Sequence, residues 1–388
     1  MSEMNARERF LAIAEFKKPD MVPVGGGPRK ATLERWYEEG LPRNVDLSTY
    51  FKFTQREDIT SCPGQGFEHD WDIFSSQGIN LGPSPPFEYK ILEKNDRYWV
   101  WIDSLGITQR GFKEDWENGW CGFATRQFLE FPVKDRASFL EVKKKYEPRI
   151  PEIYPKNWNE TVQRLSRRDY PLNVVLRGPF WWTRDMMGLK NMLLAMYTDP
   201  GLIRDIMDFC AEFQTTVLEK ALDEVDADSA VFNEDMAYKK GPMIGPSAFK
   251  EFMFKPYREM CSFLKEHGVA VIEIDSDGNS EPLINLWVEA GINSLSPCEI
   301  AANMDPLRLR KSYPRLILRG GIDKRELAKN RQAIENEVLS KVPYLIEKGG
   351  YFPGVDHGVP PDISLDNFKY FLNFTRRICG WPEEYTIH

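Results

Sequence analysis

The second half of the chain repeats one pattern: a short apolar run, a turn of glycine and polar residues, and a helical stretch. The apolar runs lie at 172–177, 228–232, 269–274, 292–296, 316–319 and 351–354. Helical periodicity separates them, most clearly over 200–224 and 331–348. Apolar strands that alternate with helices form right-handed crossovers around a parallel sheet. The pattern therefore predicts an α/β protein with a parallel sheet.

The number of repeats narrows the fold further. A strand at 21–24 and another near 70–79 bring the count to about eight units, which predicts a (β/α)8 TIM barrel in a single domain spanning residues 1–388. The alternative is a doubly wound open sheet. That fold needs a topological switch and usually a glycine fingerprint, and the glycines at 25–27 lack the GxGxxG spacing.

One region interrupts the barrel pattern in the first half of the chain. Residues 87–93 and 97–103 alternate in polarity around Asn95 and Asp96, which predicts a β-hairpin. Helical stretches follow at 137–146 and 159–168. We interpret residues from about 80 to 168 as an insertion of a hairpin and helices, and as a candidate lid.

Charge and hydropathy exclude several classes of partner. The formal net charge is −8 and the pI is near 5.4, and no basic run is present, which argues against a nucleic-acid surface. No stretch approaches the roughly 20 apolar residues that a membrane span needs, and the N-terminus is too polar for a secretory signal. Six scattered cysteines without a CxxC pair are typical of reduced core residues. These features predict a cytoplasmic protein.

Polar residues, most of them acidic, follow the predicted strands. In a barrel all of them face the C-terminal mouth, where such folds keep their active sites. About half are expected to serve as helix caps. The remaining negative charge requires a counterion, protonation or a metal ion. The residues at these strand ends are Arg177, Glu234, Asp235, Asp275, Asp277, Cys298, Glu299, Asp323, Asp356 and His357.

Several of these strand ends resemble the uroporphyrinogen decarboxylase superfamily, which includes decarboxylases and zinc-dependent, corrinoid-linked methyltransferases. The matching segments are 176–180, 275–279, 320–323 and 354–362 together with Asn367. The resemblance implies a (β/α)8 barrel and a homodimer. It is closer to the methyltransferase branch, because the arginine signature that grips substrate carboxylates in the decarboxylases is missing at 25–30.

The resemblance also implies a site. The zinc methyltransferases carry His-x-Cys where this chain has Asp275 and Asp277, and a cysteine where it has His357. Carboxylates and an imidazole form a harder site for zinc or another divalent ion. The predicted metal ligands are Asp275, Asp277, Glu299 and His357. The predicted catalytic residues are His357, Asp277 and Glu234. The predicted substrate-binding residues are Arg177, Trp181, Asp235 and Asp323.

The resulting functional hypothesis is a methyltransferase. It removes a methyl group from a small methoxylated or methylated compound, such as an aromatic methyl ether, and passes it to a corrinoid protein. The corrinoid is expected on a separate partner, because the cobalamin-binding Asp-x-His-x-x-Gly motif is absent from the sequence. The alternative is a cofactor-independent decarboxylase of a small acid or a tetrapyrrole. A third reading is a barrel without catalysis that carries a corrinoid or tetrapyrrole.

Overall fold

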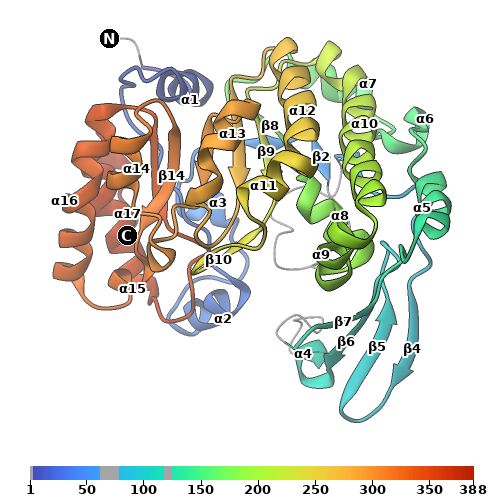
Figure 1. Ribbon diagram of the computed structural model, residues 1–388. Coiled ribbons are helices and arrows are strands. Elements are labelled where there is room, and N and C mark those ends of the chain that lie inside the picture. Colours follow the sequence, from blue (N-terminus) through green and yellow to red (C-terminus); the bar gives the residue numbers. More distant parts are fainter. Residues whose placement is uncertain (1–2, 62–77, 118–124) are drawn as a thin grey trace.

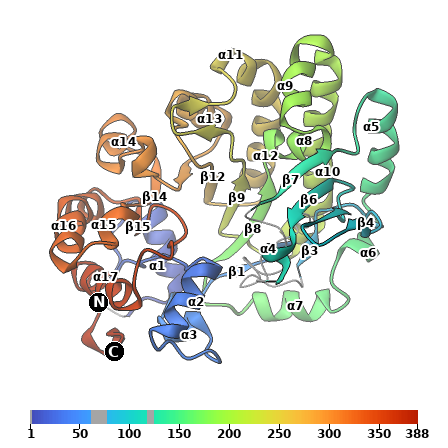
Figure 2. The same cartoon turned by 90° about the horizontal axis from the view of Figure 1, so that it is seen from below.

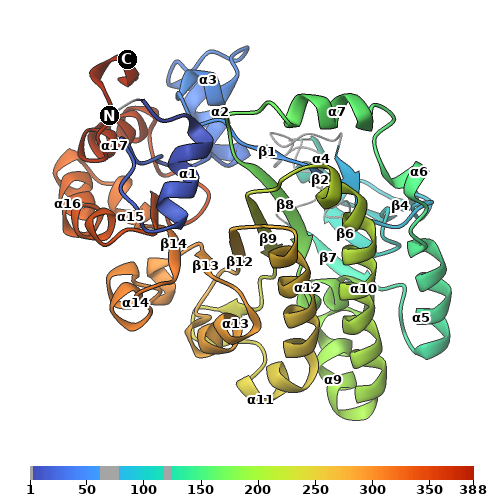
Figure 3. The same ribbon diagram turned by 90° about the horizontal axis from the view of Figure 1, so that it is seen from above.

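A curled parallel sheet of seven strands, forming a half-barrel, is the centre of the computed structural model (Figure 3). The structure describes residues 3–61, 78–117 and 125–388. All neighbouring strands of the sheet run parallel, as the alternation of strands and helices predicts. In spatial order they are β1 (Glu57–Asp58), β8 (Leu172–Arg177), β9 (Ser229–Asn233), β12 (Val271–Asp275), β13 (Ser294–Ser296), β14 (Ile317–Ile322) and β15 (Tyr351–Val355).

The segment predicted as the first strand lies beside β15 in the eighth position. It is held there by isolated parallel bridges between Gly25 and Gly354 and between Pro28 and Val359. The strand expected at 70–79 falls almost entirely outside the described residues, and β1 is the strand that pairs with β8. The fold is therefore TIM-barrel-like, as predicted, although β1 was not predicted and the segment near Gly25 forms isolated bridges.

Helices cover the outer face of the sheet (Figure 1). The predicted helices at 200–224 and 331–348 are confirmed with the same bounds, and Asn5 caps the first helix through a capping box with Glu8. No helix among the described residues is long and apolar enough to cross a membrane. The barrel helices are α1 (Ala6–Ala14), α2 (Lys30–Glu38), α3 (Leu47–Tyr50), α8 (Pro179–Met187), α9 (Leu189–Thr198), α10 (Pro200–Glu224), α11 (Pro246–Ala248), α12 (Phe254–Glu266), α13 (Ile284–Ala290), α14 (Pro306–Ser312), α15 (Lys324–Leu327), α16 (Arg331–Lys348) and α17 (Leu365–Ile378).

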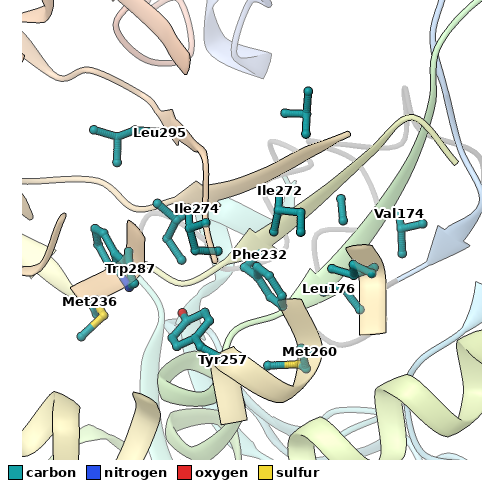
Figure 4. Close-up of a cluster of buried hydrophobic side chains, with 14 of the residues drawn as sticks. Val174, Leu176, Phe232, Met236, Tyr257, Met260, Ile272, Ile274, Trp287 and Leu295 are labelled. Carbon is teal, nitrogen blue, oxygen red and sulfur yellow. The ribbon is translucent and has the colours of Figure 1, made fainter. Parts of the chain in front are cut away.

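The main core lies between the sheet and its helices. Figure 4 shows Phe232 of β9 beside Tyr257 and Met260 of α12, all of them buried. On β8, Val174 and Leu176 are buried, whereas the intervening Asn173 and Val175 are only half-buried. Because successive side chains of a strand point to opposite faces, one face of β8 is less completely covered than the other.

The predicted insertion contains more strands than the hairpin alone. The hairpin is confirmed as β4 (Lys90–Lys94) and β5 (Tyr98–Ile102), and β6 (Thr108–Phe112) and β7 (Gln127–Glu130) extend it to a four-stranded antiparallel sheet. In Figure 1 this sheet lies below α9. Figure 2 shows that the sheet and α16 lie on opposite sides of β8 and β9. The remaining helices of this region are α4 (Lys113–Glu117), α5 (Arg136–Lys143), α6 (Ile150–Ile153) and α7 (Trp158–Leu165).

Candidate active site at the strand ends

The loops that follow β9, β12, β13 and β15 are joined by hydrogen bonds at the carboxyl edge of the sheet. The backbone N–H of Asp277 donates to Asp235 Oδ1 at 3.0 Å. The next N–H along, that of Gly278, donates to Glu299 Oε2 at 3.1 Å. His357 Nε2 lies 2.8 Å from Asp277 Oδ2. Four predicted site residues, Asp235, Asp277, Glu299 and His357, are thus brought together by tertiary structure.

The two ring nitrogens of His357 have different partners. Nδ1 is 2.6 Å from the backbone nitrogen of Gly358 and 2.7 Å from Arg29 Nη2. A backbone N–H and a guanidinium can only donate, so Nδ1 accepts both hydrogen bonds through its lone pair. The ring proton is therefore on Nε2, which donates to the carboxylate of Asp277. The imidazole of His357 therefore directs its Nε2–H at the acidic mouth.

A half-buried lysine supports the residue before His357. Lys324 Nζ, at the start of α15, lies 3.1 Å from Asp356 Oδ1 and 3.4 Å from Glu299 Oε1. Asp356 is fully buried and also accepts the N–H of Ile300 at 3.0 Å. Burial raises the pKa of the Asp356 carboxyl, while Lys324 acts in the opposite direction. This ion pair fixes the loop that carries His357.

The acidic residues after β9 and β12 lie close enough to repel one another. Burial, and secondarily the neighbouring Asp235 and Asp277, raise the pKa of Asp275 well above its ordinary value. Burial and Asp277 likewise raise the pKa of Asp235. Asp277 itself keeps 38% of its side chain exposed. The crowding of negative charge inferred from the sequence therefore raises the pKa values of the half-buried Asp235 and Asp275, whereas the side chain of Asp277 is partly open to solvent.

Asp235 also has an unusual backbone conformation. Its φ is +36°, in the left-handed region that side chains other than glycine rarely adopt. Its carbonyl accepts a hydrogen bond from Arg184 Nη1 at 3.2 Å, and its side chain holds the N–H of Asp277. Backbone strain of this kind persists where surrounding contacts enforce it, and it concentrates at functional sites.

Trp181 is flanked by two cations. The guanidinium of Arg177, at the end of β8, lies 4.8 Å from the indole centroid, and that of Arg184 lies at 4.2 Å. Cation–π contacts at these distances hold the ring in place. The predicted substrate-binding residues Arg177 and Trp181 therefore form one cluster, which Arg184 links to the carbonyl of Asp235.

Glu234 is fully buried and holds the N-terminus of α8. Its carboxyl accepts the N–H groups of Phe180 at 3.1 Å and Trp181 at 3.0 Å, and the hydroxyl of Tyr257 at 2.5 Å. Two of the unpaired N–H donors at the start of a helix are thereby satisfied. Burial raises the pKa of Glu234 to about 8, against the effect of these donors. Glu234 therefore positions Trp181 by accepting its backbone N–H.

The raised pKa of Glu234 predicts a pH-dependent stability. In the unfolded chain this carboxyl loses its proton near pH 4.5, but in the folded protein only near pH 8. The native state therefore binds the extra proton between these values, and stability falls as pH rises through this window. Glu234→Gln stays neutral, so we expect its urea midpoint to fall less between pH 5 and pH 8 than that of the native protein. An equal fall in both proteins would assign the dependence to another group.

Asp323 lies apart from these contacts. It caps α15 by accepting the N–H of Arg325 at 2.9 Å, and its carboxylate pairs with the guanidinium of the same arginine at 2.6 Å. The side chain of Asp323 is buried. The structure therefore places this predicted substrate-binding residue at a helix cap.

The predicted metal ligands do not converge in this arrangement. Within the described residues, no group of three or more histidine, cysteine, aspartate or glutamate side chains is placed to hold a metal ion. Asp277 and His357 meet, but Glu299 is engaged by Lys324 and Gly278. Cys298 is buried, and burial raises the pKa of its thiol to about 12. The residues present do not fit a zinc site, and metal binding stays a prediction.

Two residues at the site were not predicted from the sequence. Arg29 contacts His357 from the N-terminal segment, and Lys324 pairs with Asp356. Both residues lie in the loops that follow predicted strands, the same position that marked the acidic residues.

Comparison with known proteins agrees with this geometry. A parallel half-barrel with polar residues at the carboxyl ends of its strands defines the class of TIM-barrel-like α/β proteins. Residues 129–378, well over half of the chain, match the family model described as uroporphyrinogen decarboxylase (URO-D). The chain therefore belongs to the URO-D family.

Solved structures of similar fold include a methyltransferase from Methanosarcina mazei, with a TM-score of 0.57 and 13% sequence identity over 97% of this chain and 99% of that one. A B12-independent methionine synthase from Shewanella sp. W3-18-1 is more distant, with a TM-score of 0.38 and 11% identity over 75% of this chain and 74% of that one. A comparison with curated protein sequences finds no match. At these identities the structural likeness concerns the fold alone.

Proposed function

We propose that this protein is a methyltransferase that takes a methyl group from a small methylated compound and passes it to a corrinoid carried by a separate protein. Membership of the URO-D family and the whole-chain likeness to a protein described as a methyltransferase support a transferase or lyase. The observation that carries the proposal is the pair of His357 Nε2–H and Asp277 at the mouth, 2.8 Å apart.

The pair suits a reaction in which a leaving atom gains negative charge. In the proposed reaction the bond between methyl carbon and oxygen breaks, the electron pair stays on oxygen, and the methyl group moves to the acceptor. The corrinoid of the partner would supply the cobalt(I) acceptor. In the substrate complex the Nε2–H of His357 would turn from Asp277 to the leaving oxygen as a hydrogen-bond donor, and water supplies the proton that this oxygen takes up as the alcohol or phenol is released. The ring of Trp181, with Arg177 and Arg184 against it, is the proposed wall for the rest of the substrate.

A specific observation favours a second candidate, a decarboxylase of a small acid. The exposed guanidinium of Arg29 lies at the mouth beside His357, where it could pair with a substrate carboxylate. In this reaction CO₂ leaves with the carbon–carbon bond broken, and a carboxyl with a raised pKa, such as that of Asp235, would deliver a proton to the resulting carbanion.

A single assay separates the two candidates. The purified protein is incubated with free cob(I)alamin and a panel of aromatic methyl ethers and N- and S-methylated compounds, and methylcobalamin is followed by its absorbance spectrum. We expect methylcobalamin and the demethylated product in equal amounts with at least one donor. Release of CO₂ from a parallel panel of small acids without cobalamin, and no methyl transfer, would instead support the decarboxylase.

A further inference from the structure

We propose that Arg29 is a positioning residue that fixes the tautomer of His357 and so makes it a hydrogen-bond donor toward the mouth. The Nδ1 lone pair of His357 is occupied by Arg29 Nη2 at 2.7 Å and by the N–H of Gly358 at 2.6 Å. The ring proton is then on Nε2, facing Asp277. This role lies beyond the proposed methyl transfer, because it concerns the imidazole itself whatever the reaction is.

The backbone around Arg29 is built to hold this contact. The N–H of Arg29 donates to the carbonyl of Val359 at 3.1 Å, and the N–H of Val359 donates to the carbonyl of Gly27 at 2.8 Å. Thr32 Oγ1 donates to the same Val359 carbonyl at 2.6 Å. The start of α2 is thus attached to the residues just after His357. The position of Arg29 is set by main-chain contacts, although its side chain is exposed.

Gly358 is part of the same arrangement. A Cβ at this position would lie 3.3 Å from both Cγ and Nε of Arg29, closer than most side-chain contacts. The absence of a side chain at residue 358 therefore lets the arginine lie flat against the loop and reach Nδ1. Gly358→Ala would press on the arginine without removing its charge, which provides an independent way to disturb the contact.

The chemical consequence is that His357 presents an N–H and no free lone pair to the mouth, and a substrate atom receives this N–H by replacing Asp277 as its acceptor. A neutral imidazole that donates through Nε2 can stabilise negative charge developing on a substrate atom, as an electrophilic catalyst does. To act through Nε2 as a base or as a metal ligand, the ring would have to move its proton to Nδ1 and give up both hydrogen bonds there. Arg29 therefore favours His357 as a hydrogen-bond donor over His357 as a base or a metal ligand.

The tautomer can be read directly by NMR of protein labelled with ¹⁵N-histidine. The chain has four histidines, and the His357 signals are identified by their loss in His357→Gln. In the native protein we expect a protonated Nε2 and an unprotonated Nδ1. Loss of one hydrogen bond at Nδ1 should raise the Nδ1–H population on the order of fivefold in Arg29→Met. Arg29→Lys, which keeps a donor, should restore part of the native pattern.

Two further variants complete the test. Gly358→Ala should shift the His357 nitrogens in the same direction as Arg29→Met. Arg43→Met, which removes an exposed arginine that contacts Glu34 and Tyr37, should leave them unchanged. A native His357 protonated at Nδ1, or nitrogen shifts that are the same in Arg29→Met and the native protein, would overturn the proposal. These readouts need no substrate, so a failed methyl-transfer assay would leave the result intact.

Discussion

Replacing His357 or Asp277 by alanine should lower the rate of methyl transfer on the order of 10²- to 10⁴-fold, the range typical of a lost proton donor or its partner. His357→Ala removes the N–H that faces the leaving atom. Asp277→Ala removes the carboxylate that accepts this N–H at 2.8 Å and leaves the imidazole unoriented. The measurement is the initial rate of methylcobalamin formation with the donor that the native protein accepts.

The matched control for this result is His267→Ala. His267 caps the end of α12 just before β12 begins, at the opposite edge of the sheet from the carboxyl ends of the strands, and its Nδ1 lies 2.8 Å from the carbonyl of Phe263. We expect it to retain the native rate. If His357→Ala and Asp277→Ala keep native rates while remaining folded by circular dichroism, the site does not act as proposed. Equal losses in all three variants would indicate a general loss of folded protein.

Gly178→Ala should cause the largest loss of stability among single-methyl additions at the site. A Cβ at residue 178 would lie 2.0 Å from Glu234 Oε2 and 2.3 Å from its Cδ. The buried carboxyl cannot swing into solvent, and moving it breaks its hydrogen bonds to Phe180, Trp181 and Tyr257. We expect the free energy of unfolding to fall by about 3–5 kcal/mol, because of overpacking and because N–H groups at the start of α8 lose their partners. The measurement is the urea concentration at the midpoint of unfolding.

Gly245→Ala provides a closely matched control. Gly245 also precedes a proline at the first position of a helix and also has extended backbone angles, but a Cβ there would meet no atom within 4 Å. We expect the free energy of unfolding to fall by less than about 1 kcal/mol, which is the difference between glycine and alanine as a helix cap. Similar losses in the two variants would show that capping rather than the clash with Glu234 determines the effect.

The sequence was sufficient for the main architecture because each strand and helix carries its own local signal. β8 and α10 have the predicted bounds, and the hairpin around Asn95 is present. The start of the barrel was predicted least well, since the two-residue β1 that pairs with β8 was not predicted and the segment near Gly25 forms isolated bridges. Short strands depend on their neighbours for pairing, so periodicity alone locates them poorly.

The residues of the site were harder to assign than the strands. Glu234, Asp235 and Asp323 all follow apolar runs, yet their surroundings differ: Glu234 holds the start of α8, Asp235 holds the N–H of Asp277, and Asp323 caps α15. The type of residue and its place after a strand are common to all three. The difference comes from which neighbouring loop supplies the donors.

By itself, the sequence determined the parallel α/β architecture and the edge of the sheet at which polar side chains gather, because strand period, helix period and the order of elements are local properties of the chain. Tertiary structure alone decided what those side chains do. Arg29 and His357 are separated by 328 positions, and only the folding of the N-terminal segment against β15 brings the guanidinium to Nδ1. The protonation pattern of an imidazole depends on the donors around it, and those donors come from distant parts of the chain.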